Sequence, residues 1–250
     1  MSGHSKWSTI KHKKGKTDAQ RGKIFSKFSR EIMVAAKEGG GDESMNARLR
    51  LIVQKAKAGN MPNDNIKRAI QKGTGGGSEA NLDAITFEAY APDGVALLID
   101  SLTDNRNRTI TNIKIILNKA GANMAEKGAV SYMFEKKGIF IFPAGASEEK
   151  VMEAALDGGA QDVVTNSDGS IEVICLLAEF DSVRSSLESA KLKYESAEII
   201  QDAETKISLE SEESARKILA LVDKLEDDDD VQAVYGNFDI SESILNGLEN

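Results

Sequence analysis

The sequence predicts a multidomain protein of α and β structure, with an N-terminal three-helix bundle followed by two α+β (ferredoxin-like) domains. Apolar residues follow helical spacing up to residue 75 and strand-like patterns beyond it. Residues 138–207 have the β-α-β-β-α-β order of a ferredoxin-like fold. Residues 79–134 show only β-β-α-β, and the missing helix and strand occur at 211–245. We therefore expect a discontinuous middle domain, 79–134 plus 211–245, into which 138–207 is inserted.

The bundle is expected over residues 21–75, after a flexible basic arm at 1–20. Its first helix is capped by Thr17 or Asp18, the second follows Asp42, and the third follows a cap and proline at 60–64. The expected apolar faces are Phe25, Phe28, Ile32 and Ala36 in the first helix, Met45, Leu49, Ile52, Val53 and Ala56 in the second, and Ile66, Ala69 and Ile70 in the third.

A glycine-rich run at 72–78 marks the end of the bundle. It is typical of a flexible hinge. A phosphate-binding loop is the alternative, but such loops end in Gly-Lys-Ser or Gly-Lys-Thr between a strand and a helix, and this run follows a helix.

Beyond the hinge the pattern alternates between strands and helices. In the middle domain we expect strands at 85–90, 95–102, 129–134 and 231–240, with helices at 109–120 and 214–225. In the inserted domain we expect strands at 138–142, near 163, at 171–177 and at 197–207, with helices at 147–156 and 181–192. The run Glu226–Asp230 is interpreted as a solvated turn, because it lacks the glycine and terminal glutamate of a calcium loop.

Charge is divided along the chain. Residues 1–75 carry 17 Lys and Arg against 6 Asp and Glu, a net of +11, and the rest carry 15 against 34, a net of −19. A polyanion should therefore meet the N-terminal head, while the acidic body repels it.

The arm combines lysines with both histidines and the only tryptophan. Cations bind phosphate and flat rings stack on bases, so the arm suits nucleic acid, although a frayed, solvated tail is the alternative. The candidate nucleic-acid-binding residues are His4, Lys6, Trp7, Lys11, His12, Lys13, Lys14, Lys16, Arg21, Lys23, Lys27, Arg48, Arg50, Lys67, Arg68, Arg106 and Arg108.

Two of these candidates, Arg106 and Arg108, lie in the body, where a strand ends and a helix begins. Free backbone N–H groups and guanidinium groups at such a point favour an oxyanion. Alternatively, Asp104, Asn105 or Asn107 caps the helix and the arginines pair with acidic neighbours.

Nothing in the sequence indicates an enzyme. There is no Cys-x-x-Cys, His-Glu-x-x-His or Gly-x-Ser-x-Gly pattern, and Cys175 lies in an apolar strand where a buried thiol is ordinary. We expect no cofactor, no metal site and no small-molecule substrate. The apolar runs are too short to cross a membrane, and the single cysteine fits a reducing cytoplasm, so we expect a cytoplasmic protein with no membrane partner.

Several motifs closely resemble the YebC/PmpR family, which includes the mitochondrial translational activator of cytochrome c oxidase. They are Gly-His-Ser-Lys-Trp at 3–7, Arg-Gly-Lys-Ile-Phe at 21–25, Asn-Met-Pro-Asn-Asp-Asn-Ile at 60–66, Arg-Ala-Ile at 68–70, Thr-Asp-Asn-Arg-Asn-Arg-Thr at 103–109 and Tyr-Met-Phe at 132–134. The resemblance implies a non-enzymatic cytoplasmic protein with a helical N-terminal domain and two α/β domains. It implies either DNA-binding transcription regulation or a ribosome-associated role in translation.

The chain departs from the family pattern at a helix start and at two turns. Ala47 stands where a proline is usual, Ala89, Ala91 and Asp93 replace glycines, and the usual glycine-rich turn reads differently over 121–128. None of these changes removes a cation of the head.

Three functions remain open at this point. Duplex DNA would require a helix that presents Arg48, Arg50 or Arg68 to base edges in the major groove. Ribosomal RNA would suit the arm, with Trp7 stacked on a base and the lysines along the backbone. The third possibility is a protein adaptor whose acidic body binds a basic partner.

Overall fold

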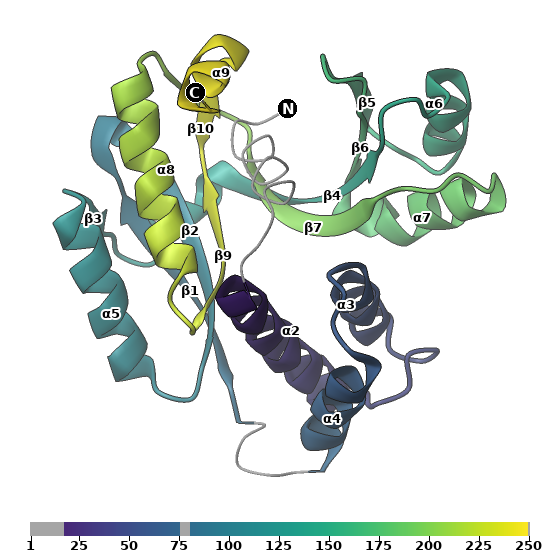
Figure 1. The fold of residues 1–250 in the computed structure, drawn as a ribbon, viewed down its shortest axis with the longest axis horizontal. Helices are drawn as coiled ribbons and strands as arrows, with labels where there is room; N and C mark the ends of the chain where they lie inside the picture. Colours follow the sequence, from purple (N-terminus) through teal and green to yellow (C-terminus); the bar gives the residue numbers. More distant parts are fainter. Residues whose placement is uncertain (1–17, 76–80, 250) are drawn as a thin grey trace. The chain divides into compact units, whose positions relative to one another are not determined.

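The computed structural model describes residues 18–75 and 81–249 (Figure 1). They form two compact units, one made of Phe134–Asp202 and the other of the described residues on either side of it. Among the described residues, no helix is long and apolar enough to cross a bilayer.

The head consists of three helices, α2 (Asp18–Gly39), α3 (Ala47–Ala58) and α4 (Asn63–Thr74). Their apolar faces form one core, with Phe28, Ile32, Leu49, Val53 and Ile66 among its buried members. Asn46 caps α3: its side chain accepts from the backbone N–H of Leu49 and donates to the carbonyl of Ala35 at 2.8 Å. Met45 precedes this cap and is 83% exposed, so its predicted place on the buried face is wrong.

The predicted hinge starts too early. Gly73 belongs to the last turn of α4 and is buried, because a Cβ at this position would lie 2.5 Å from the carbonyl oxygen of Met33 in α2. Only glycine permits this close approach of two helix backbones. Residues 76–78 of the run lie outside the described residues.

The first sheet has the strand order β3-β1-β2-β9. β1 (Asp83–Tyr90) and β2 (Ala96–Thr103) form an antiparallel hairpin over a 3-10 turn, η2 (Pro92–Gly94), with Tyr90 opposite Ala96. α5 (Arg106–Lys119) follows, and β3 (Asn123–Met124) then pairs with β1. Ile113 and Leu117 of α5 pack into the core of this sheet.

The predicted strand at 129–134 is wrong. Instead, η3 (Ser131–Met133) occupies half of it and β4 begins at Phe134. The cause is Glu88 of β1, whose buried carboxylate accepts from the backbone N–H groups of Gly128, Val130 and Ser131 at 2.7 to 3.0 Å. These N–H groups are therefore engaged by a side chain and cannot join a strand ladder.

The inserted unit is ferredoxin-like, with sheet order β5-β6-β4-β7 and both helices contributing buried residues. Its elements are β4 (Phe134–Phe142), α6 (Glu148–Asp157), β5 (Asp162–Thr165), β6 (Ile171–Leu176), η4 (Leu177–Glu179), α7 (Phe180–Ser189) and β7 (Ser196–Ala203). The strand predicted at 197–207 is in fact two, because a turn separates β7 from β8 (Ile207–Leu209).

The chain then returns to the first sheet. α8 (Glu212–Glu226) packs into its core, and β9 (Val231–Gly236) pairs antiparallel with β2. β10 (Phe238–Ile240) pairs in parallel with β8, and α9 (Glu242–Glu249) follows. The turn between α8 and β9 is the acidic run 226–230, which we call the acidic turn.

Candidate nucleic-acid interface

The predicted interface divides into residues of the arm, of the head helices and of the body. The arm residues lie outside the described residues; they are His4, Lys6, Trp7, Lys11, His12, Lys13, Lys14 and Lys16. The other candidates can be placed.

Cations of α3 and α4 lie on the surface of the head. Lys67 and Arg68 of α4 are exposed, and Arg68 donates to the side chain of Asn65 at 2.5 Å. Arg48 of α3 is exposed and pairs with Glu38, whereas Arg50 is half-buried and donates to the carbonyl of Glu43 at 3.4 Å. The exposed cations of α3 and α4 are therefore accessible to a polyanion.

The α2 cations contact the body instead. Lys23 donates to the carbonyl of Asp227 at 3.2 Å and to its carboxylate at 3.3 Å, and Lys27 donates to the carbonyl of Glu226 at 2.6 Å. Arg30, which was not among the predicted site residues, donates to the carboxylate of Asp230 at 2.8 Å. Arg21 is exposed at the start of the described part of this helix.

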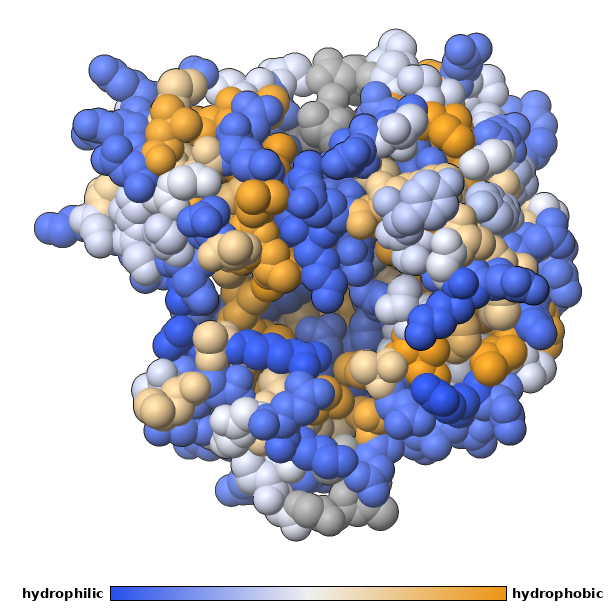
Figure 2. All heavy atoms as spheres, turned by 180° about the vertical axis from the view of Figure 1, so that it is seen from behind, coloured by the Kyte–Doolittle hydropathy of each residue, from blue (hydrophilic) through white to orange (hydrophobic). Residues whose placement is uncertain are grey.

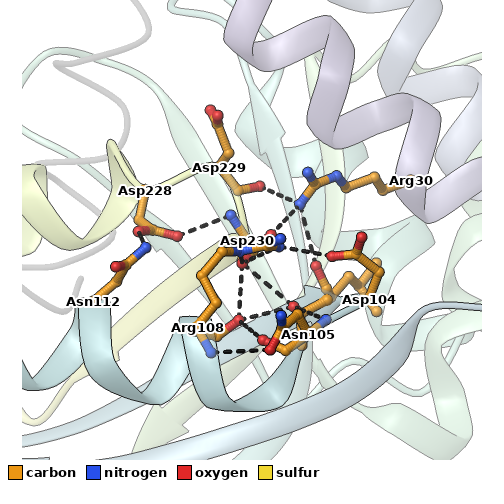
Figure 3. A network of polar contacts seen from close by, with 11 residues as sticks. Arg30, Asp104, Asn105, Arg108, Asn112, Asp228, Asp229 and Asp230 are labelled. Atoms are coloured by element: carbon orange, nitrogen blue, oxygen red, sulfur yellow. Dashed lines mark hydrogen bonds and ion pairs between the residues drawn. The ribbon is translucent and has the colours of Figure 1, made fainter.

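The loop between β2 and α5 holds Arg106 and Arg108 in contacts within the chain. The side chain of Asn105 caps α5 by accepting from the backbone N–H of Arg108 at 3.1 Å. Arg106 pairs with Asp83 at 3.2 Å, and both side chains are more than 60% exposed. Arg108 instead points to the acidic turn (Figure 3).

Asp230 is the centre of this network. Arg108 donates to its two carboxylate oxygens at 2.9 and 2.8 Å, and the hydroxyl of Thr109 lies 2.8 Å from one of them. The hydroxyl of Thr103 is 3.3 Å from the same oxygen, and Arg30 donates to the other carboxylate oxygen. The carboxylate is 4% exposed, so donors from α2, β2 and α5 replace its water.

These contacts shift the pKa values of Asp230 and Arg108. Burial raises the pKa of Asp230, but the hydrogen bonds from Arg108, Thr109 and Arg30 outweigh burial, so its pKa lies below the ordinary value. The same carboxylate, with that of Asp104, raises the pKa of Arg108. Both groups are charged at neutral pH, and the pair is a charge-assisted contact.

The strand end, helix start and guanidinium groups thus form an anion site whose anion belongs to the same chain. The sequence motif at 103–109 indicates an anion site but not the anion. The anion is the carboxylate of Asp230, 122 residues away from Arg108. Two patterns in the sequence could have indicated that the acidic run supplies this anion. Arg30 follows Lys23 and Lys27 at helical spacing, and five consecutive acidic residues at 226–230 could have been matched to that row of cations.

The described residues contain no group of three or more His, Cys, Asp or Glu side chains arranged to hold a metal ion. Cys175 is buried, and burial raises the pKa of its thiol to about 11. A thiol of this kind is a poor nucleophile at neutral pH.

The fold and this site define a multidomain α+β protein with a cationic helical head, joined by ion pairs to an acidic turn. A family model described as the TACO1/YebC protein N-terminal domain matches residues 5–76, and one described as the TACO1/YebC second and third domain matches residues 82–238. The chain belongs to the TACO1/YebC family.

Its relatives include proteins named "Probable transcriptional regulatory protein". The one from Rubrobacter xylanophilus is 53% identical over 98% of both chains. The one from Francisella tularensis subsp. novicida is 48% identical, again over 98% of both. A crystal structure of a conserved hypothetical protein from Aquifex aeolicus is 42% identical and superposes with a TM-score of 0.84, covering 94% of this chain and 97% of that one.

Proposed function

We propose that this chain is a non-enzymatic regulator of gene expression that binds nucleic acid through its head. The observation that carries the proposal is the exposed cationic surface of α4, together with the charge division of +11 in residues 1–75 against −19 in the rest. The names of the relatives, which are those of probable transcriptional regulators, support the regulatory role.

In this proposal α4 and the arm contact phosphate. Lys67 and Arg68 lie side by side in the sequence of α4 and are exposed, and the only acidic residue of that helix is Asp64 in its first turn. Exposed lysines and arginines bind phosphates without regard to sequence, and their contribution decreases as salt increases. Arg108 has no part in this surface, because Asp104 and Asp230 hold its guanidinium.

The first candidate function is DNA binding with transcription regulation, because the relatives' names describe probable transcriptional regulators. The second candidate is a translation factor that binds the ribosome or ribosomal RNA. It is favoured by the composition of the arm, where Trp7 lies among lysines, because single-stranded RNA offers exposed bases for stacking.

The experiment is crosslinking in cells followed by sequencing of the nucleic acid that copurifies with the full chain. Recovery of discrete DNA sites supports the first candidate, and recovery of ribosomal RNA supports the second. A Lys67→Glu, Arg68→Glu variant should lose this recovery, whereas Lys150→Glu, which reverses an exposed cation of α6 (Glu148–Asp157), should retain it. Recovery of neither nucleic acid, with basic proteins copurifying instead, would contradict the proposal and favour a protein adaptor.

A further inference from the structure

The acidic turn contacts α2 through one row of cations. Lys23, Lys27 and Arg30 are spaced by four and three residues, so they lie on one face of the helix. All three donate to the acidic turn, at distances of 2.6 to 3.3 Å. In Figure 1 the start of α2 accordingly lies beside the connection between α8 and β9.

The acceptors on the turn are backbone carbonyl and carboxylate oxygens. Lys27 meets the backbone carbonyl of Glu226, the last residue of α8, and Lys23 meets the carbonyl of Asp227, its C-cap. The last carbonyls of a helix have no partner within the helix and lie at the negative end of its dipole. Together with the carboxylate of Asp227 they present a row of partly negative oxygens to α2.

The row of contacts between α2 and the acidic turn has an exposed end and a buried end. At the exposed end, the side chains of Lys23 and Asp227 are 44% and 70% exposed. At the buried end, Arg30 is 25% exposed and Asp230 is 4% exposed, and Arg108 holds Asp230 from the other side. Exposed ion pairs contribute little free energy and are screened by salt, whereas breaking a buried pair is costly. An incoming phosphate can therefore replace Asp227 on Lys23 while the contacts of Asp230 persist.

We propose that one end of the acidic turn, Glu226 and Asp227, is an internal competitor for nucleic acid at Lys23 and Lys27, so that a phosphate binding to α2 must first replace these contacts while Asp230 stays in place. This inference rests on the proposed function and adds a regulatory contact to it. Competition of this kind lowers affinity for all polyanions and favours ligands with enough further contacts, on the arm and α4, to compensate.

On the face shown in Figure 2, hydrophilic side chains predominate and hydrophobic ones occur in small groups between them. Singly exposed apolar side chains, such as Met45 and Tyr132, are ordinary for a protein surface.

The test measures binding of the full chain to two labelled probes, a mixed-sequence duplex DNA and a single-stranded RNA of the same length. Asp227→Asn removes the competing carboxylate and should tighten binding about 1.5- to 5-fold at low salt, the range set by exposed ion pairs. Asp229→Asn is the matched control. It removes the same charge from the same turn, but the contact of Asp229 with α2 is made by its backbone carbonyl, which the substitution keeps. Its gain should be smaller.

A double-mutant cycle tests whether the gain in affinity depends on Lys23. With Lys23→Ala in place, Asp227→Asn should no longer tighten binding, because the cation for which the two anions compete is absent. Thermal unfolding of each variant verifies that the comparison is between folded proteins. The inference is overturned if wild type binds a probe while Asp227→Asn binds no tighter, or if the gain persists without Lys23; the proposed function survives either result. If wild type binds neither probe, both are overturned.

Discussion

The guanidinium of Arg108 contacts both carboxylate oxygens of Asp230, at 2.9 and 2.8 Å, across 122 residues of sequence. The pair joins the start of α5 to the start of β9, the strand that returns to the first sheet after the inserted unit. Arg30 of the head helix α2 donates to the same carboxylate. One buried acidic side chain thus connects three segments that are distant in the sequence.

Arg108→Ala should destabilise the protein, because it leaves the buried carboxylate of Asp230 without its main partner. Removal of one member of a buried pair costs about 3 to 5 kcal/mol, and the partial exposure of Arg108 places the expected loss near the lower end, at about 3 kcal/mol. Urea denaturation measures the change. Arg106→Ala is the control, since its pair with Asp83 is exposed and its loss should cost at most about 0.5 kcal/mol. Equal losses in both variants would contradict the role given to Asp230.

The carboxylate of Asp230 should also affect how the free energy of unfolding changes with acidic pH. The pKa of Asp230 in the folded protein lies below the ordinary 3.8, so its ionised form stabilises the fold above that pH. This contribution is lost as the pH falls through the folded pKa, because the unfolded chain then binds more protons than the folded one. In Asp230→Asn the free energy of unfolding should be lower at neutral pH and should fall less steeply below pH 3.8. Parallel curves for wild type and variant would show that Asp230 titrates normally.

Glu88→Gln should weaken the loop that precedes the inserted unit. Burial raises the pKa of Glu88, but the hydrogen bonds from the backbone N–H groups of Gly128, Val130 and Ser131 lower it by more. The pKa therefore lies below the ordinary value. An amide has one acceptor oxygen where the carboxylate has two, so at least one buried N–H group loses its partner, at a cost of about 1 to 3 kcal/mol. Hydrogen exchange of these three amides should accelerate. Glu126→Gln, an exposed change in the same loop, should leave exchange as it is in wild type.

Gly73→Ala should destabilise the head, because its Cβ would meet the backbone of Met33 at 2.5 Å. Overpacking of this kind costs about 1 to 3 kcal/mol. Gly22→Ala is the matched control in α2, where a Cβ would meet nothing within 4 Å. It should stabilise the helix by up to about 1 kcal/mol. Thermal unfolding of the two variants should therefore shift in opposite directions, and a shift of both in one direction would contradict the close packing of α2 on α4.

The elements that the sequence predicts well are those whose burial follows a regular spacing. Ile32, Leu49 and Ile66 are buried on the three head helices as their spacing predicts. The failures have local causes. Asn46 begins α3 one residue after Met45, and Glu88 engages the backbone of 128–131 and prevents a strand there. Gly73 resembles a hinge residue in sequence but is a packing residue, because composition does not report how closely two helices approach.

The candidate site was predictable only in part. Exposed Lys67 and Arg68 follow from the polar face of an amphipathic helix. The pairing of the acidic turn with α2 was not predicted, although the row of cations and the five acids are both visible in the sequence, because neither pattern alone shows that the two segments meet in the fold. Asp230 therefore looks like one solvated acid among five in the sequence, although it is 4% exposed in the fold.

The most direct test of the central claim, that the head binds nucleic acid, is the salt dependence of binding by the full chain to the labelled duplex and single strand. Reversal of Lys11, Lys13 and Lys14 to Glu in the arm, or of Lys67 and Arg68 in α4, should weaken binding. Each lost phosphate contact should also reduce the log–log slope by roughly 0.7 to 0.9. Lys150→Glu in α6 should match wild type in affinity and slope. Unchanged affinity and slope in both head variants would contradict the claim.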